Sequence, residues 1–352
     1  QDRKLVEIVK ATYFNPKIVV IDETTTALSQ EGREELYKHM ERIRKSGNTV
    51  IFISHDLPEI ILKSDTITIL RDGVYIDTVK SKDVNENDLK KLMVGREVTG
   101  DYYRSDYGEK VSDEVVLSVK DVTVPGLIEN VSFDLHKGEI LGFGGLSESG
   151  MHEIGKAIFG ASYDREGTVE LADGTQINDI PTAIKHSIAY TSKDRDNESV
   201  VLNQSIGDNI CLPSLDELSG PAHLISDKKK KDFANKFAKQ MSVKMVDVNQ
   251  FVSNLSGGNK QKVVLGRWIG KDSDIVVLDS PTRGIDIKVK QDIYQLMNQM
   301  RKNGKSIIMI SEELMELIGM CDRIMIMKDG KISGELERDQ NLDENGLITM
   351  MD

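Results

Sequence analysis

Two glycine-rich stretches of this 352-residue sequence combine residue types and spacing that can bind an anion. Ser256, Gly257 and Gly258 stand immediately before a segment with the apolar periodicity of a helix. Residues 144–150 form the second stretch, between an apolar run typical of a buried strand and another helical pattern. Small residues at a helix start expose backbone N–H groups, and the helix dipole favours negative charge there. Both stretches are therefore candidate phosphate-binding elements.

The second stretch has only part of the pattern of a working phosphate loop, G-x-x-x-x-G-K-[S/T]. In that pattern the glycines let backbone N–H groups surround the phosphates, the lysine neutralises their charge and the hydroxyl holds Mg²⁺. Here Gly145 and Gly150 keep the glycine positions, but Met151 and His152 replace the lysine and the hydroxyl, and Glu148 adds a negative charge. Loss of the lysine alone weakens phosphate binding by about ten- to two-hundredfold. We expect this loop to hold nucleotide loosely, through its backbone.

Two aspartates, Asp22 and Asp279, end apolar runs of almost the same composition, Ile-Val-Val-Ile-Asp and Ile-Val-Val-Leu-Asp. The match extends beyond these runs. At the offset of 257 residues that separates the two aspartates, residues 1 to about 74 align with the second half of the chain without a gap. Two copies of one domain explain this repeat. Residue 1 aligns with Gly258, so we expect an N-terminally truncated first copy without its own phosphate loop, first strands and helical subdomain.

Hydrophobic periodicity predicts the elements that position these residues. In both copies apolar strands alternate with helical patterns, which indicates an α/β fold whose parallel sheet is covered by helices. Turn residues after the second strand of the first copy predict a short antiparallel hairpin. We divide the chain into residues 1–97, the C-terminal part of the first copy, a charged linker at 98–114, and residues 115–352, a complete second copy that is mostly helical at about 200–254.

The composition limits the possible partners. The formal net charge of −12 argues against a nucleic acid, because binding its phosphates requires clustered lysine and arginine. Cys211 and Cys321 have no metal-ligand spacing and make no disulfide framework, which fits a reducing cytoplasm. No apolar run reaches the length of about 18–20 residues needed for a membrane span. If the protein acts at a membrane, we expect it to do so through partner chains.

The glycine stretch and the aspartate strand together resemble the ATPase domain of the ABC family. Residues 255–259 read Leu-Ser-Gly-Gly-Asn, which is similar to the signature motif of that family, and the strand that ends at Asp279 is similar to its Walker B strand. The tandem arrangement and the motif Pro-Thr-Arg-Gly-Ile-Asp at 281–286 resemble the ribose, galactose and xylose importers, in which two ATPase domains are fused. The resemblance implies a P-loop NTPase fold with a mixed sheet, a helical subdomain and an antiparallel β subdomain, present as one partial and one complete copy.

The resemblance also implies roles for single residues. Asp22 and Asp279 would bind Mg²⁺ at their respective sites. Glu23 would polarise the attacking water as the catalytic base, and His55 would sense the γ-phosphate of ATP. The residues that would close over phosphates held by the other copy are Ser256, Gly257, Gly258 and Asn259.

The second copy departs from the family at two of these places. Ser280 follows the Walker B aspartate where the family has a glutamate, and a serine hydroxyl cannot act as a base near pH 7. Glu312 stands at the position of the family's switch histidine, where its charge would repel a γ-phosphate. We therefore expect hydrolysis only at a composite site made by Glu23 and His55 of the first copy with the signature motif of the second.

For the whole protein, the resemblance implies an ATP-binding and ATP-hydrolysing subunit that energises import of a monosaccharide or related solute. Its partners would be membrane-spanning permease subunits and, indirectly, an extracellular or periplasmic solute-binding protein, with no nucleic acid. It would lie at the cytoplasmic face of the cell membrane. Two alternatives stay open: a non-catalytic fragment that binds nucleotide or partners, because no intact phosphate loop is present, and a soluble tandem ABC ATPase, which usually keeps two competent sites.

Overall fold

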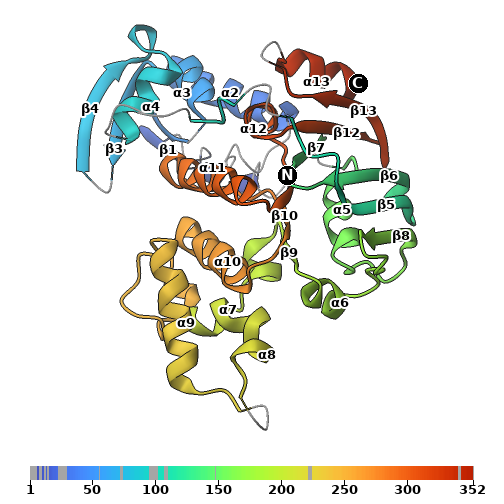
Figure 1. The fold of residues 1–352 in the computed structure, drawn as a ribbon. Coiled ribbons are helices and arrows are strands. Elements are labelled where there is room, and N and C mark those ends of the chain that lie inside the picture. Colours follow the sequence, from blue (N-terminus) through green and yellow to red (C-terminus); the bar gives the residue numbers. More distant parts are fainter. Residues whose placement is uncertain are drawn as a thin grey trace. The chain divides into compact units, whose positions relative to one another are not determined.

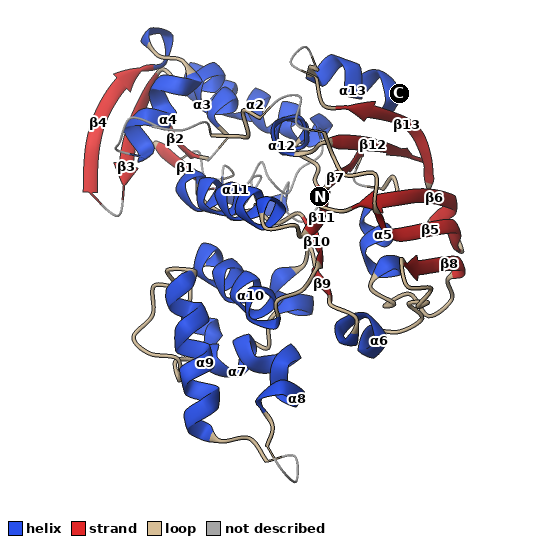
Figure 2. Cartoon of the chain, viewed as in Figure 1, coloured by secondary structure: helices blue, strands red, loops and turns tan. Residues whose placement is uncertain are grey.

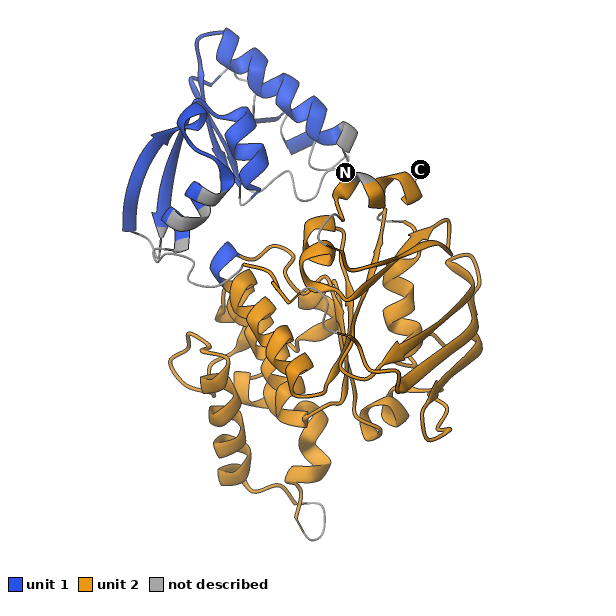
Figure 3. Ribbon diagram, turned by 45° about the horizontal axis from the view of Figure 1, so that its top comes forward, with its two compact units in different colours: residues 1–100, 286–288 blue, residues 101–285, 289–352 orange. Residues whose placement is uncertain are grey.

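The chain forms two compact units, each with its own hydrophobic core (Figure 3). Unit 1 comprises residues 1–100 with 286–288, and unit 2 comprises residues 101–285 with 289–352. The structure, a computed structural model, describes residues 6–7, 10–11, 13, 16–22, 30–54, 56–71, 74–94, 102–106, 110–146, 148–220, 224–339 and 342–351.

Unit 2 is built on a six-stranded mixed sheet in the order β13-β12-β7-β11-β10-β9 (Figure 1). All neighbours are parallel except β13, which pairs antiparallel with β12. Strands β10 and β11 are buried along their whole length, as expected for parallel strands covered on both faces. The bounds are β7 Ile140–Gly145, β9 Ile188–Thr191, β10 Ile275–Asp279, β11 Ser306–Ile310, β12 Arg323–Lys328 and β13 Lys331–Glu337.

Two further regions of unit 2 accompany this sheet (Figure 2). The first is a three-stranded antiparallel sheet in the order β6-β5-β8, with β5 Val115–Val124, β6 Ile128–His136 and β8 Glu166–Leu171. The second is a helical region formed by α7 Ile206–Cys211, α8 Leu215–Leu218, α9 Asp227–Gln240 and α10 Gly257–Lys271. The predicted mixed sheet with antiparallel β and helical subdomains is thus confirmed. The remaining helices are α5 Met151–Ile158, α6 Ile180–Lys185, α11 Ile287–Lys302, α12 Leu314–Met320 and α13 Glu344–Met351.

Unit 1 repeats the C-terminal part of unit 2 element by element. Each of its four strands, and helices α2 and α3, has a counterpart 257 residues later with the same bounds. The pairing register also repeats, since Ile18 pairs with Thr49 and Ile275 with Ser306. The structure therefore confirms the internal repeat. The elements are β1 Ile18–Asp22, α2 Gln30–Lys45, β2 Thr49–Ile53, α3 Leu57–Lys63, β3 Thr66–Arg71, β4 Val74–Lys80 and α4 Glu86–Val94.

Each copy also has a buried glutamate in the helix that follows β2 in unit 1 and β11 in unit 2. Glu59 in α3 and Glu316 in α12 are 7% and 1% exposed. A buried carboxylate is destabilising unless hydrogen bonds satisfy it, and here hydroxyl groups from neighbouring elements do so. The donors are Tyr37 and Ser54 for Glu59, and Tyr294, Thr282 and Ser311 for Glu316.

The parallel strands of unit 1 are less covered than their counterparts. Burial alternates along β1, where Ile18 and Val20 are 60% and 58% exposed, whereas every residue of β10 is buried. In unit 2, helix α5 packs on β10 and β11, and the described part of unit 1 contains no counterpart of this helix. The exposed face of β1, which carries Ile18 and Val20, is therefore the face that a helix covers in the other copy.

Residues 102–106, inside the predicted linker, pack on unit 2. The rings of Tyr102 and Tyr103 lie against Tyr294, with centroids 5.4 and 5.3 Å from its ring. The next side chain, Arg104, is buried and donates to Asp322 at 2.7 Å. This part of the connection is consequently fixed to unit 2.

Candidate functional site

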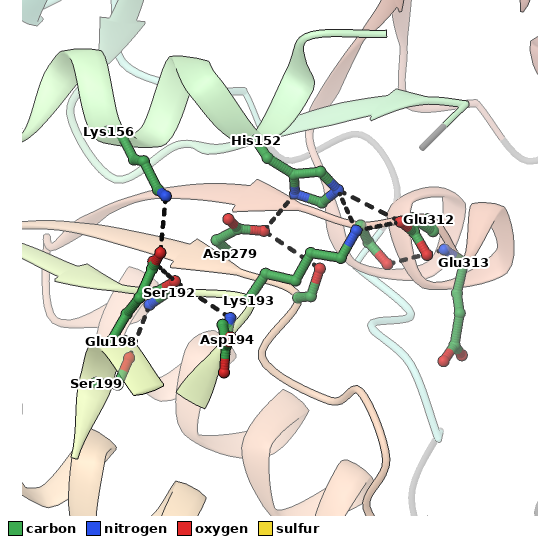
Figure 4. A network of polar contacts seen from close by, with 12 residues as sticks. His152, Lys156, Ser192, Lys193, Asp194, Glu198, Ser199, Asp279, Glu312 and Glu313 are labelled. Carbon is green, nitrogen blue, oxygen red and sulfur yellow. Dashed lines mark hydrogen bonds and ion pairs between the residues drawn. The ribbon is translucent and has the colours of Figure 1, made fainter. Parts of the chain in front are cut away.

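The carboxyl ends of parallel strands in unit 2 border a cleft of about 670 Å³. Ligands of open α/β sheets bind at such strand ends. The walls of the cleft come from the start of α5, the loop after β9 and the turn after β10 (Figure 4). Charged side chains of both signs line it, among them His152, Lys156, Lys193, Arg195, Asp279 and Arg283.

The loop between β7 and α5 depends on the two predicted glycines at its ends. Gly150 is the N-cap of α5 with a φ of 90°, a left-handed conformation that favours glycine. A Cβ on Gly150 would lie 2.7 Å from the carbonyl oxygen of Leu127, and a Cβ on Gly145 would lie 2.6 Å from that of Met327. Both glycines are therefore required by the packing of this strand–loop–helix arrangement.

The two residues that replace the lysine and the hydroxyl have different surroundings. Met151 is fully buried in the hydrophobic core, so the lysine position brings no charge to the cleft. His152 instead lines the cleft and is directed toward the strand ends (Figure 4). The sequence pattern marked both positions as departures, but it did not show that only His152 faces the site.

His152 joins three other side chains in one network. Its Nδ1 lies 2.7 Å from Oδ1 of Asp279, the residue predicted to bind Mg²⁺. Its Nε2 lies 3.0 Å from Nζ of Lys193 and 3.4 Å from Oε1 of Glu312. Lys193 also donates to Glu312 at 2.6 Å. The network therefore connects α5, the loop after β9, the end of β10 and the loop after β11.

The electrostatic environment favours protonation of His152. Burial lowers the pKa of its imidazole, but hydrogen bonds with Asp279 and Glu312 outweigh burial, so the pKa is raised above its ordinary value. Burial and the nearby charge of Asp279 also raise the pKa of Tyr190, which keeps that phenol neutral. Asp279 itself is 1% exposed.

A second cluster lies beside the first network. Glu198 accepts a hydrogen bond from the Ser192 hydroxyl and pairs with Lys156 at 3.0 Å. The hydrogen bond from Ser192, with further help from Lys156, lowers the pKa of the Glu198 carboxyl. Lys260 similarly pairs with Asp196 at 3.2 Å. Several charged groups around the cleft are thus already paired within the chain.

The four signature residues lie together at the start of α10. Ser256 is the exposed N-cap of this helix, with φ of −65° and ψ of 159°, and no helix amide donates to its side chain. Its hydroxyl accepts a hydrogen bond from the Asn259 side chain at 3.0 Å. A Cβ on Gly257 would lie 3.1 Å from the Arg195 guanidinium. This helix start, with Ser256 exposed and Gly257 and Gly258 partly exposed, has the features that favour anion binding.

The predicted residues of the first copy are only partly described. Asp22 ends β1, as the sequence predicts, and is exposed. Glu23 and His55 lie outside the described residues. The geometry of the predicted composite site therefore stays a prediction.

Comparison with known proteins identifies the family. Residues 128–283 match the family model described as ABC transporter. The chain is similar to a ribose import ATP-binding protein, RbsA, of Clostridium tetani, with 37% identity over 97% of this chain and 68% of that protein. It is also similar to a xylose import ATP-binding protein, XylG, of Thermoanaerobacter pseudethanolicus, with 42% identity over 95% of this chain and 67% of that protein. The chain belongs to the ABC transporter ATP-binding family.

Solved structures support the fold of this ABC ATPase. A dimeric bacterial ABC transporter cassette matches 63% of the chain and 99% of its own length, with a TM-score of 0.56 and 22% identity. A nucleotide-free ATP-binding cassette from an ABC transporter matches 67% and 95%, with a TM-score of 0.57 and 18% identity. The predicted ABC-type P-loop fold is confirmed, and membership of this family makes the chain one of a class of ATP-hydrolysing enzymes.

The described residues of the second copy do not fit the Mg²⁺ site that the family implies. Mg²⁺ in phosphate loops is held by a serine or threonine hydroxyl together with the Walker B aspartate. Here an imidazole replaces that hydroxyl and bonds directly to Asp279, whose Oδ1 also accepts from Ser280 at 3.2 Å. Within the described residues, no group of three or more His, Cys, Asp or Glu side chains is arranged to hold a metal.

Among the described helices of this ABC ATPase chain, none combines the length and apolar character needed to cross a bilayer.

Lys193 is a site residue that the sequence analysis did not predict. Its reach across the cleft to Glu312 depends on tertiary structure, which residue spacing does not contain.

Proposed function

We propose that this chain is the ATP-hydrolysing subunit of an importer for a monosaccharide or related solute. The main support for this proposal is the 37–42% identity with ribose and xylose import ATP-binding proteins over 95–97% of this chain. Because this sequence similarity spans both copies of the repeat, it favours the same function for this chain. Permease subunits in the membrane are the proposed partners, and the cytoplasmic face of the cell membrane is the proposed location. A solute-binding protein would deliver the substrate.

The proposed catalytic site is composite. Asp22, at the end of β1, would bind Mg²⁺ through water, and Glu23 would polarise the water that attacks the γ-phosphate. His55 would donate a hydrogen bond to that phosphate. The start of α10 would close over the nucleotide with its backbone amides and the hydroxyl of Ser256. The residue types at these positions support this assignment, and closure around ATP would drive the permease by domain rearrangement.

ATP hydrolysis by two chains tests the proposal. Phosphate release is measured for the 352-residue chain and for a version that carries a complete first copy. We expect no turnover above background for the first and clear turnover for the second, because the residues before Glu23 in the 352-residue chain contain no G-x-x-x-x-G-K-[S/T] pattern. Turnover by the 352-residue chain alone would mean that the second copy is catalytic. Absence of turnover in both would favour the non-catalytic alternative.

Solute uptake tests the remaining part. The gene is inactivated in its host, and uptake of radiolabelled ribose, xylose and galactose is measured with and without the version that carries a complete first copy. We expect uptake of one of these sugars, or of a related solute, to depend on that version. Normal uptake of all three without the gene would contradict a role in their import.

A further inference from the structure

The Walker B aspartate of unit 2 already has a partner. In family members that use metal, this carboxylate faces Mg²⁺ and its waters. Here Nδ1 of His152 lies 2.7 Å from Oδ1 of Asp279, and the Ser280 hydroxyl donates to the same oxygen at 3.2 Å. With Asp279 only 1% exposed, these bonds satisfy Oδ1 of a carboxylate that has little access to water.

We propose that His152 takes the place of Mg²⁺ in unit 2, so that the chain's own side chains close this cleft to metal-bound nucleotide. The inference concerns unit 2 alone and does not rest on the proposed import function. It goes beyond the expected loss of hydrolysis, because it assigns an occupant to the metal position and predicts that metal no longer strengthens nucleotide binding there.

The charges of the network support this proposal in either protonation state of His152. If the imidazole is neutral, its Nδ1–H donates to Asp279 and its Nε2 accepts from Lys193, which leaves one cation against two carboxylates. If the imidazole is protonated, two cations face Asp279 and Glu312. Neither state has the surplus positive charge that a triphosphate requires. Lys193 cannot replace the missing loop lysine without giving up its 2.6 Å bond to Glu312.

The network also ties together segments that are distant in sequence. His152 belongs to the first turn of α5, Lys193 to the loop after β9 and Glu312 to the loop after β11 (Figure 4). In the sequence, Lys193 is 41 residues from His152 and 119 residues from Glu312. Entry of Mg²⁺ with a γ-phosphate would have to break the contact of His152 with Asp279 and the ion pair of Lys193 with Glu312, and each broken charge-assisted bond costs affinity. The latch formed by His152, Asp279, Lys193 and Glu312 therefore opposes metal–nucleotide binding as one unit.

Nucleotide binding with and without metal tests the latch in the full chain. Binding of a fluorescent ATP analogue is measured in Mg²⁺ and in EDTA. For the unmodified chain we expect affinities that agree within about twofold. His152→Thr supplies the missing hydroxyl and releases Asp279, so we expect Mg²⁺ to strengthen binding by about tenfold. Glu153→Gln is the matched control, because Glu153 lines the same cleft outside the latch; it should behave like the unmodified chain.

Two results would overturn the proposal. One is Mg²⁺-dependent binding by the unmodified chain that disappears in Asp279→Asn, since this residue would then be a metal ligand. The other is a folded His152→Thr variant that gains no metal dependence. If that variant does not fold, NMR of the unmodified chain decides. The ring signal of His152 is assigned as the signal that is lost in His152→Gln. This signal should stay sharp when Mn²⁺ and ATP are added, and broadening of the signal by Mn²⁺ would refute the latch.

Discussion

Glu23 and Ser280 occupy the same position of the repeat, and they differ in what they can do to a water molecule. A carboxylate can accept a proton from water in the transition state, whereas a serine hydroxyl cannot do so near pH 7. His55 and Glu312 form the second such pair, 257 residues apart. An imidazole can donate to a phosphate oxygen, and a carboxylate repels it. The proposed catalytic asymmetry between the copies therefore depends on single side chains at matched positions of the repeat.

Substitution of these matched positions tests the asymmetry. In a version with a complete first copy, Glu23→Gln should lower the rate of ATP hydrolysis by about 10²–10⁴-fold, because general base catalysis is lost. Nucleotide affinity should change little. Ser280→Ala is the control at the same position of the repeat and should leave the rate within about twofold. Equal losses in both variants would show that the second copy takes part in the chemistry.

Asp106 provides a pH-dependent contribution to stability. Burial raises the pKa of this carboxyl, but the hydrogen bonds and charge of Arg104, with the charge of Arg301, outweigh burial and hold the pKa below its ordinary value. The folded pKa is thus lower than the unfolded value of about 3.9. Its ionisation therefore stabilises the folded chain above about pH 3.9, and this stabilisation is lost as the pH falls through the folded pKa.

The variant Asp106→Asn tests this contribution. Its free energy of unfolding should be lower than that of the unmodified chain at pH 7, and the difference should shrink as the pH falls below about 3.9. Urea unfolding at a series of pH values measures both quantities. A difference that stays constant over this range would show that the charge of Asp106 does not stabilise unit 2.

Helix α12 shows how one element depends on a segment far away in sequence. Gly319 lies inside this helix, where alanine would ordinarily be more stable by about 1 kcal/mol. A Cβ at this position would overlap the ring of Tyr103, which belongs to the segment that connects the two copies. The glycine is therefore required by the approach of that ring, and α12 accepts a weaker helix former to accommodate it.

A double-mutant cycle tests this explanation. Gly319→Ala should destabilise unit 2 by about 1–3 kcal/mol, because the ring of Tyr103 must move from a packed site. In a Tyr103→Ala background the same change should be neutral or stabilising by up to about 1 kcal/mol. Thermal unfolding of the four chains gives the coupling. Equal effects in the two backgrounds would refute the proposed overlap.

At the scale of the whole molecule, the proposed chemistry requires both copies. The residue that would polarise water belongs to unit 1, and the glycine-rich helix start belongs to unit 2. Hydrolysis by such a composite site should respond to changes in either unit. Because the chain has a net charge of −12, we expect local amides and helix dipoles to provide the attraction for phosphate.

A matched pair of substitutions in unit 2 tests this requirement. Ser256→Arg places a bulky side chain at the exposed start of α10, whereas Ser253→Arg places it three residues earlier at another exposed position. In the version with a complete first copy, we expect Ser256→Arg to lower ATP turnover by about 10²-fold or more, because the phosphate-facing donors are displaced. Ser253→Arg should keep turnover within about threefold. Comparable losses would argue against a specific role for the helix start.

The sequence by itself determined the repeat, the strands that end in Asp22 and Asp279, and the glycine-rich starts of α5 and α10. Local periodicity and backbone requirements encode these features, so element bounds 257 residues apart coincide. Met151 and His152, at the lysine and hydroxyl positions of the pattern, also indicated a degraded phosphate loop.

Only the tertiary structure decided what these substitutions do. It buries Met151 in the core, turns His152 onto Asp279 and brings Lys193 within 2.6 Å of Glu312. It also fixes residues 102–106 of the predicted linker on unit 2. The physical reason is that side-chain direction and long-range ion pairs depend on how distant segments pack. The spacing of residues along the chain does not contain that information.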